Sequence, residues 1–478
     1  MKYLYFLIAF LILVLLSTSR VSAASYYVSL SGSDSNNGSQ FAPFKTFNKS
    51  MSVLGAGDTL YINGGTYTES LNVNKSGNAG APITIRGVAG QNVVIDAEYQ
   101  RLAPLNIPEG TSYVNVADVE VIRSTFECVY LGGTHINVNG IDANTCRKFG
   151  YRVKGSYITI ENSQCRDSVT ENLGGGNTSG GWGSCLKTAP YSHHLTIRNN
   201  HIFNNWGEGL IIGQAANSSA YGNLVHDNFS MNIYIGNAHD IDVYKNITYS
   251  TNPTYYRGGS PASCINASEE LISPEWGARL GNIRVFNNIA YGCKMGMGYT
   301  YTEVPNNGCN NCLFAYNTLV NTGGIKVIAG TKNHVLFVNN IIKGGTKTFL
   351  GGDVVERNNL FSDPLFAVNP GLTSDTYRLS ANSPAINSAE IIAGINDDYY
   401  GNSKGSNPDI GAMEFGGVVV TNSSDLNSDG KVDIFDFNIL LGNFGKTGSN
   451  GFIPSDIDSN GKVDIFDFNL LLGNFGKI

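Results

Sequence analysis

Two short acidic segments near the end of the chain carry oxygen-bearing side chains at a regular spacing. They read DLNSDGKVDIFD, from Asp425 to Asp436, and DIDSNGKVDIFD, from Asp456 to Asp467. Calcium is held by carboxylate, amide and carbonyl oxygens on loops of this length, with glycine at the sixth position for the sharp turn. The sequence therefore predicts two calcium loops, whose ligands are Asp425, Asn427, Asp429, Lys431 (carbonyl), Asp433, Asp436, Asp456, Asp458, Asn460, Lys462 (carbonyl), Asp464 and Asp467.

A second group of candidate residues lies on short alternating segments in the middle of the chain. We align SCLKTA, EGLIIG, NIYIGN and SCINA so that their apolar residues share one inward column: Leu186, Leu210, Ile233 and Ile265. The next residue of each segment then points outward: Lys187, Ile211, Tyr234 and Asn266. We predict that Lys187, Glu208, Asn232 and Tyr234 line one patch of candidate catalytic residues. His193, His194 and Arg257 are further candidates near turns.

The elements that must position this patch repeat along the chain. Short alternating segments end in an asparagine at a period near 23, as from Asn200 to Asn223 and on to Asn246. Further units end at Asn288, Asn317, Asn340 and Asn359. A fixed period of this size predicts a solenoid of stacked coils. Asparagine tolerates a left-handed bend, and stacked amides bond along the stack, so we predict a structural asparagine ladder.

These repeats resemble the right-handed parallel β-helix proteins of the pectate lyase superfamily. The opening text YYVSLSGSDSNNGSQFAPFKTFNKSM resembles their first coil, with Phe47 to Leu54 as a capping helix. The text from FSDPLF to PDIGAMEF, ending at Phe415, resembles their closing section. The fold class expected is mainly β, a right-handed parallel β-helix solenoid followed by a small α-helical calcium-loop domain. The resemblance fixes the fold more firmly than the activity, because one fold hosts many chemistries.

In the calcium-dependent lyases of this superfamily, a lysine or arginine removes a proton beside a carboxylate. The resemblance therefore implies a calcium-assisted lyase acting on uronic-acid polysaccharide, with Lys187 as base and acidic or amide groups nearby. A non-catalytic β-helix that binds glycans or acts as an adhesin is the alternative. Hydrolysis by paired carboxylates ranks lower, because the one adjacent pair, Asp397-Asp398, lies outside the regular coils.

The twin loops resemble those of the dockerin family, since an aspartate closes each loop and a single apolar helix follows it. That resemblance implies attachment to a cohesin-like partner protein. Ile434-Phe435 and Ile465-Phe466 stand where many dockerins carry small hydroxyl residues, so the kind of partner is open. The expected organisation is a signal peptide at 1–23, the β-helix at 24–416, a linker at 417–424 and the dockerin-like domain at 425–478.

The amino terminus predicts export of the chain. Lys2 precedes an unbroken apolar run from Leu4 to Leu16, and Val21-Ser22-Ala23 supplies small residues for cleavage. We therefore expect a secreted or cell-surface-attached protein, with an uncleaved anchor as the alternative. The 8 cysteines permit disulfides in such a compartment, and buried free thiols are the alternative. A net charge of −7 without a basic run indicates no nucleic-acid partner.

Overall fold

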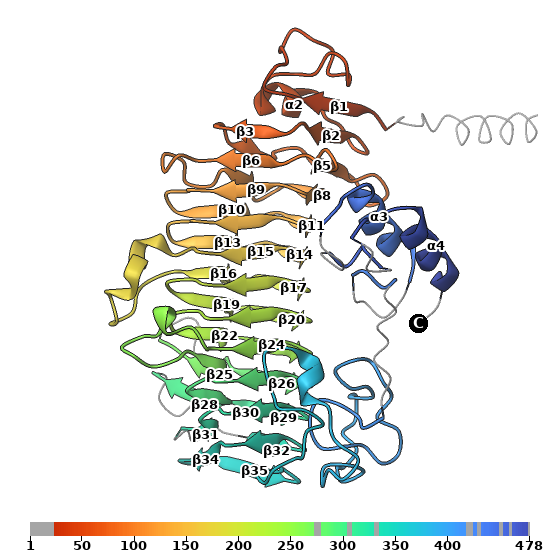
Figure 1. Cartoon of the computed structure of the whole chain (residues 1–478). Coiled ribbons are helices and arrows are strands. Elements are labelled where there is room, and N and C mark those ends of the chain that lie inside the picture. Colours follow the sequence, from red (N-terminus) through yellow and green to blue (C-terminus); the bar gives the residue numbers. More distant parts are fainter. Residues whose placement is uncertain are drawn as a thin grey trace, which may run out of the picture.

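The computed structural model describes residues 23–271, 279–303, 308–328, 334–416, 424–427, 432–448, 453–457 and 461–476. Three long parallel sheets form the walls of one coiled stack, in which each coil contributes a short strand to each sheet (Figure 1). Parallel strands need a connection that returns the chain to the same edge, and here the other two walls of the coil provide it. The predicted parallel β-helix solenoid is confirmed.

The described strands fall into sheets of 13, 11 and 11 strands, which we call sheets 1, 2 and 3. Sheet 1 contains β1 (Ser25–Val28), β2 (Thr59–Ile62), β5 (Ile83–Gly87), β8 (Ser112–Ala117), β11 (Thr134–Asn139), β14 (Ser156–Glu161), β17 (His193–Arg198), β20 (Ala216–Tyr221), β23 (His239–Tyr244), β26 (Gly281–Phe286), β29 (Asn310–Ala315), β32 (His334–Val338) and β35 (Asp353–Arg357). Sheet 2 contains β4 (Leu71–Asn72), β7 (Leu105–Ile107), β10 (Glu127–Leu131), β13 (Phe149–Val153), β16 (Ser184–Thr188), β19 (Glu208–Gly213), β22 (Met231–Gly236), β25 (Ser263–Glu269), β28 (Met295–Thr302), β31 (Gly324–Val327) and β34 (Thr346–Phe349). Sheet 3 contains β3 (Gly65–Tyr67), β6 (Val93–Asp96), β9 (Glu120–Ile122), β12 (Asp142–Asn144), β15 (Gln164–Arg166), β18 (His201–Phe203), β21 (Leu224–His226), β24 (Ile247–Tyr249), β27 (Ile289–Tyr291), β30 (Thr318–Val320) and β33 (Ile341–Lys343).

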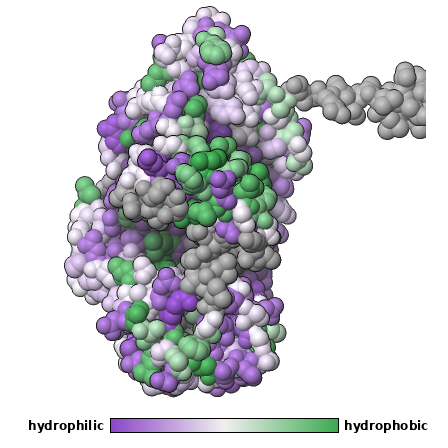
Figure 2. All heavy atoms as spheres, turned by 45° about the vertical axis from the view of Figure 1, so that its right-hand side comes forward, coloured by the Kyte–Doolittle hydropathy of each residue, from purple (hydrophilic) through white to green (hydrophobic). Residues whose placement is uncertain are grey.

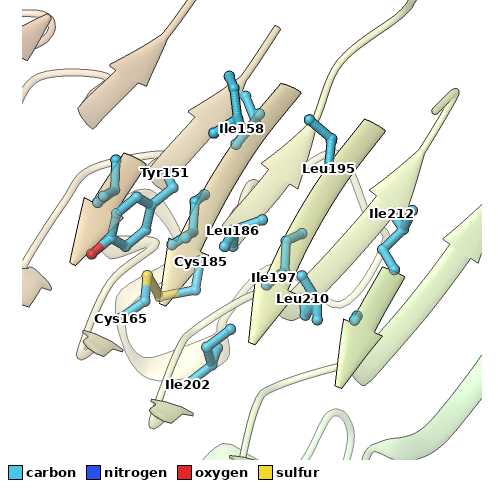
Figure 3. Close-up of a cluster of buried hydrophobic side chains, with 14 of the residues drawn as sticks. Tyr151, Ile158, Cys165, Cys185, Leu186, Leu195, Ile197, Ile202, Leu210 and Ile212 are labelled. Carbon is cyan, nitrogen blue, oxygen red and sulfur yellow. A yellow bond between two sulfur atoms is a disulfide. The ribbon is translucent and has the colours of Figure 1, made fainter. Parts of the chain in front are cut away.

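The core runs along the inside of the stack. The predicted inward column is present, because Leu186 pairs with Leu210, Leu210 with Ile233 and Ile233 with Ile265. Figure 3 shows side chains from three walls meeting inside the coils: Tyr151, Ile158, Cys165, Cys185, Leu186, Leu195, Ile197, Ile202, Leu210 and Ile212. One coil could not bury these residues alone, so the stack supplies the apolar burial that stabilises each coil.

The predicted asparagine ladder is confirmed at one bend of the coil. The Nδ2 of Asn200 donates to the Oδ1 of Asn223 at 3.0 Å, and Asn223 bonds Asn246 in the same way at 2.9 Å. The chain of amides continues through Asn288, Asn317, Asn340 and Asn359. These amides satisfy buried backbone groups at each bend, which would otherwise lack partners.

The two ends of the stack are closed differently. Helix α2 (Phe47–Val53) covers the first coil as predicted, with Thr46 as its N-cap. Residues 361–416 contain the 3-10 helix η4 (Ser374–Tyr377) and pack against the side of the last coils. In that segment the carbonyl of Glu390 accepts hydrogen bonds from the Tyr316 hydroxyl and the Asn339 amide.

All eight cysteines form disulfides, so the free-thiol alternative is wrong. The pairs are Cys128–Cys146, Cys165–Cys185, Cys264–Cys293 and Cys309–Cys312. Each of the first three pairs joins residues at least 18 positions apart. Disulfides of this kind persist in oxidising compartments.

Two helices follow the β-helix, and we call residues 424–476 the C-terminal module. Helices α3 (Ile434–Asn443) and α4 (Ile465–Asn474) each begin with a capping box between two aspartates. Leu440 and Leu471 are buried between them. The two halves brace one another reciprocally, because Asn443 donates to Ser455 and Asn474 donates to Ser424. In Figure 1 the module lies beside sheet 1. The signal peptide up to residue 22 and the linker from 417 to 423 lie outside the described residues.

Candidate active site

A column of outward side chains crosses the strands of sheet 2. Tyr130 on β10 pairs with Arg152 on β13, which pairs with Lys187 on β16. Lys187 then pairs with Ile211, and Ile211 with Tyr234. Neighbouring strands are about 4.8 Å apart, so these residues follow one another at that spacing along the stack. The predicted order of Lys187, Ile211 and Tyr234 is therefore the observed one.

Glu208 stands at the edge of the same outer face. It opens β19 opposite Ser184, one strand beyond the strand of Lys187. Burial raises the pKa of Glu208 to about 7, the Lys187 charge opposes this rise, Glu270 adds to it, and Arg257 opposes it. All four groups therefore share one electrostatic environment. A carboxyl group with a pKa near 7 can exchange a proton at neutral pH.

Aromatic rings position the cations on this face. The Lys187 Nζ lies 5.9 Å from the centre of the Phe149 ring, and the Arg152 guanidinium carbon lies 5.8 Å from it. Phe149 packs edge-on against Phe126 at 5.5 Å. Cations are attracted to the face of an aromatic ring, so this pair of rings restrains both positive side chains. Arg152 and Lys187 thus present two neighbouring positive charges to a ligand.

Two inserted loops meet beside Lys187. The first contains the 3-10 helix η1 (Thr170–Gly175), and the second contains the 3-10 helix η2 (Pro253–Tyr255). Arg257 from the second loop lies 4.7 Å from the ring centre of Trp182 in the first. Its Nε donates to the carbonyl of Thr178 at 2.9 Å, and Nη1 donates to Ser230 at 3.3 Å. Arg257 therefore braces the two loops against each other.

The side chains of the outward column become buried after Lys187. Ile211 is 5% exposed and Tyr234 is 6% exposed, although both point away from the core. The Tyr234 hydroxyl donates to Glu270 Oε1 at 2.7 Å. Burial, then the charge of Glu270, raises the pKa of Tyr234 far above its usual range. Tyr234 therefore belongs to the patch but is covered, so its ring is not an open platform for a sugar.

The structure corrects the place of Asn232. The predicted register is the observed one, with Ile233 opposite Leu210, but Asn232 points inward although alternation from Ile233 would turn it outward. It is fully buried, its Nδ2 donates to the carbonyl of Tyr249 at 2.8 Å, and its Oδ1 accepts from Asn228 at 3.0 Å. Asn232 is a structural residue of the coil interior and does not reach the patch.

The remaining candidates do not all lie near Lys187. His193 and His194 lie on β17 of sheet 1, with their Nδ1 atoms 2.7 Å apart, and so face away from Lys187. Of the further candidates His193, His194 and Arg257, only Arg257 reaches the patch, where its charge opposes the rise in the pKa of Glu208.

Sequence reasoning missed Arg152 and Glu270. The segment FGYRV aligns with SCLKT in the observed register, so a basic residue after an inward side chain was a usable signal for Arg152. Glu270 follows the last residue of β25 and reaches Tyr234 from outside that strand. No sequence pattern shows that contact, because it depends on how the chain leaves the coil.

Several buried polar atoms near the patch have no hydrogen-bond partner among the described residues. They are Glu127 Oε2, Trp182 Nε1 and Ser184 Oγ. Buried polar groups are nearly always paired in folded proteins, by the protein, by water or by a ligand. Ser184 pairs in register with Glu208, and Arg152 opposes the rise that burial causes in the pKa of Glu127. These orphaned atoms mark the surroundings of Lys187 as a place where a polar ligand could bind.

No three His, Cys, Asp or Glu residues come together as a metal site in the part of the chain that the structure describes. The predicted calcium ligands Asp429, Lys431, Asp458 and Asn460 lie outside it. The described ligands fit a cation well. Asp436 is fully buried, and its carboxylate accepts backbone N–H groups of Leu426, Asn427 and Asp433. Asp467 is buried in the equivalent position. Buried carboxylates facing loops of oxygen donors are suited to calcium.

The C-terminal module exposes an unusual amount of apolar surface. Figure 2 shows hydrophobic side chains gathered over its helices. Phe435 and Phe466, at equivalent places in the two halves, are both 62% exposed. Their neighbours Ile434 and Ile465 are also exposed. A contiguous apolar patch of this kind is typical of an interaction surface.

None of the described helices is long and apolar enough to cross a membrane.

Comparisons with known proteins agree with the fold. A family model described as "Pel9A-like, right handed beta helix region" matches residues 26–209. The uncharacterized protein YwoF of Bacillus subtilis is 25% identical over 390 residues, covering 69% of this chain and 77% of that protein. Pectate lyase L of Dickeya chrysanthemi is 23% identical over 443 residues, covering 84% and 91%. The crystal structure of pectate lyase Pel9A superposes with a TM-score of 0.55 at 19% identity, covering 83% of this chain and 98% of that one. The chain therefore has the parallel β-helix fold found in pectate lyase Pel9A.

Proposed function

We propose that this chain is a polysaccharide lyase acting on uronic-acid polysaccharide. The observation that carries the proposal is the meeting of Lys187 and Arg152 with Glu208, whose pKa is about 7, on one outer face. Uronic-acid chains carry one carboxylate per sugar, and two neighbouring cations at about 4.8 Å suit such a ligand. The likeness to pectate lyases in sequence and fold supports the same chemistry.

The residues divide the reaction between them. Lys187 removes the proton on the carbon beside the carboxylate, and Arg152 neutralises that carboxylate as negative charge develops. The electron pair of the broken C–H bond forms the new double bond, and the glycosidic C–O bond breaks. Protonated Glu208 delivers a proton to the leaving oxygen. The amine gains one proton and the carboxyl loses one, so transfer of a proton from Lys187 to Glu208, directly or through solvent, restores both groups for the next turnover.

Calcium assistance is part of the proposal. The described residues of this face offer no cluster of three metal-binding side chains. A cation here would therefore share its coordination with carboxylates of the substrate, and its charge would make the proton beside the carboxylate more acidic.

The C-terminal module serves attachment in this proposal. Its twin loops would each hold one calcium ion, and the exposed apolar residues at equivalent places would bind a cohesin-like protein partner. The paired cysteines and the amino-terminal apolar run support a secreted or cell-surface-attached protein.

The test is an activity screen on the mature chain. Pectate, alginate and glycosaminoglycans are incubated with calcium or with a chelator, and the ultraviolet absorbance of unsaturated uronate is followed. A lyase gives rising absorbance on at least one substrate. New reducing ends without absorbance would favour a glycoside hydrolase. Retention of the protein on a polysaccharide with neither signal would favour a glycan-binding or adhesin-type β-helix.

A further inference from the structure

We propose that this site acts on the end of a polysaccharide chain, because the outer face of sheet 2 is open on one side of Lys187 and closed on the other. The inference rests on the proposed lyase function and adds its mode of attack. It follows from the exposure of one column of side chains, from the loops beside it and from the sign of the charges along it.

The open side runs toward the first coils. Asn72, Asn106, Tyr130 and Arg152 precede Lys187 in the column, and each is at least partly exposed. Four steps between strands span roughly 19 Å along the stack. That length accommodates a short stretch of polysaccharide lying parallel to the axis of the stack, with its carboxylates toward Arg152 and Lys187.

The closed side begins with the next strand. Ile211, Tyr234 and Asn266 continue the column, and their exposed fractions are 5%, 6% and 0%. Strand β25 is buried on both of its faces. A polysaccharide that continued past Lys187 would have to displace the Tyr234–Glu270 hydrogen bond.

The two inserted loops make this end rigid. The loops that contain η1 and η2 touch each other, and Arg257 joins them through Trp182 and the carbonyl of Thr178. Phe229 packs edge-on against Trp182 at 5.4 Å, which adds a buried ring beneath this contact. The two loops are therefore packed and hydrogen-bonded to each other beside the barrier, and their contact does not depend on a single side chain.

Charge reinforces the barrier. Arg152, before the barrier on the outward column, is a cation, whereas Glu270, which bonds Tyr234 at the barrier, is an acid. A chain of uronates is attracted to Arg152 and repelled by Glu270. The polysaccharide end therefore stops beside Lys187, and cleavage releases short products from that end.

The experiment compares product length with total bond cleavage. The full-length protein is incubated with the polysaccharide that gives uronate absorbance, and viscosity and chromatographic profiles are recorded at the same time. End attack gives unsaturated mono- or disaccharides from the earliest time points, with viscosity falling only in proportion to cleavage. A rapid loss of viscosity with long early products would overturn the inference while leaving the lyase function intact. Absence of absorbance on every polysaccharide would overturn both.

Two variants test the barrier itself. Arg257→Ala removes the brace between the loops, and we expect the early products to become at least twofold longer on average. Replacement of residues 253–260 by two glycines removes the second loop, and we expect a larger change in the same direction. If both variants stay folded by circular dichroism and keep the wild-type product pattern, the loops do not set the mode of attack. If neither variant folds, the wild-type product pattern still decides the inference.

Discussion

Lys187 and Glu208 lie on neighbouring strands of sheet 2, where the ammonium charge opposes the burial that raises the pKa of the carboxyl to about 7. This relationship joins a base and an acid on one face of the stack. The first two predictions follow from it.

Substitution of Lys187 by alanine should lower the rate of uronate cleavage by at least about 100-fold, the usual contribution of a general base. The measurement is the initial rate of absorbance change on the active polysaccharide. Lys326→Ala is the matched control, because Lys326 belongs to the same outward column beyond the barrier. Equal activity of the Lys187 variant and the control would remove Lys187 from the mechanism.

Glu208→Gln should change how stability depends on pH. The folded state raises the pKa of Glu208 from its ordinary 4.5 to about 7, so between these values the folded chain holds more protons than the unfolded chain. Stability must then fall as pH rises through this window, by about 3 kcal/mol for this residue. The glutamine variant lacks that loss, so its stability relative to wild type should be higher at pH 8 than at pH 4. Urea denaturation at both pH values measures it, and an unchanged difference would contradict the assigned environment.

Calcium should bind the C-terminal module with a stoichiometry of two. Asp436→Ala removes a buried carboxylate of the first loop, and we expect isothermal titration to show one ion lost. Asp363→Ala is a control, because that aspartate pairs with Lys343 on the surface of the closing segment. Two ions bound by the Asp436 variant, or none bound by wild type, would refute the predicted loops.

Asn246→Ala should destabilise the chain by about 2 to 3 kcal/mol, because it leaves buried backbone and amide groups without partners. Asn246 is fully buried and bonds the rungs on both sides, Asn223 and Asn288. Asn359→Ala, at the partly buried end of the ladder, should cost about half as much. Chemical denaturation measures the loss in unfolding free energy of both variants. Equal losses would contradict the prediction that a fully buried amide contributes more stability than a partly buried one.

Removal of the disulfides one at a time should rank them by loop length. The Cys264–Cys293 bond closes a separation of 29 residues, whereas Cys309–Cys312 closes one of 3. The loop-entropy relation makes the longer loop worth about 2 kcal/mol more. Double alanine variants of each pair, compared by denaturation, test the ranking. A larger loss for the short loop would show that local packing at Cys309 outweighs chain entropy.

The sequence predicted the features that recur in every coil. It did not predict side-chain positions that depend on a single residue or a single tertiary contact. Asn200, Asn223 and Asn246 were identified by their spacing, the later asparagines by the alternating segment that ends in each, and the inward column of Leu186 and Leu210 by alternation. Asn232 was misplaced although the register of its strand was predicted correctly, because the residue before the inward Ile233 is also buried. Strict alternation does not hold near the start of these strands, where Cys185 and Cys264 are buried in the same way.

The candidate site was predicted in part for a related reason. Lys187, Glu208 and Tyr234 belong to regular strands and were placed on one face. The covering of Tyr234 by Glu270 and the bracing of Trp182 by Arg257 arise from loops, whose paths follow tertiary contacts and not a period. The barrier beside Lys187 was therefore beyond sequence reasoning.

The asparagine ladder allows the number of residues in a coil to vary. Asn223 and Asn246 are 23 residues apart and Asn246 and Asn288 are 42 apart, yet both amide bonds measure 2.9 Å. Each asparagine pair therefore returns the chain to the same position relative to the previous coil, whatever the length of the segment between the two asparagines. Loops at the other bends of the coil can therefore be lengthened, shortened or replaced. Evolution or a designer could then give the same scaffold a longer, shorter or open-ended substrate site without rebuilding its core.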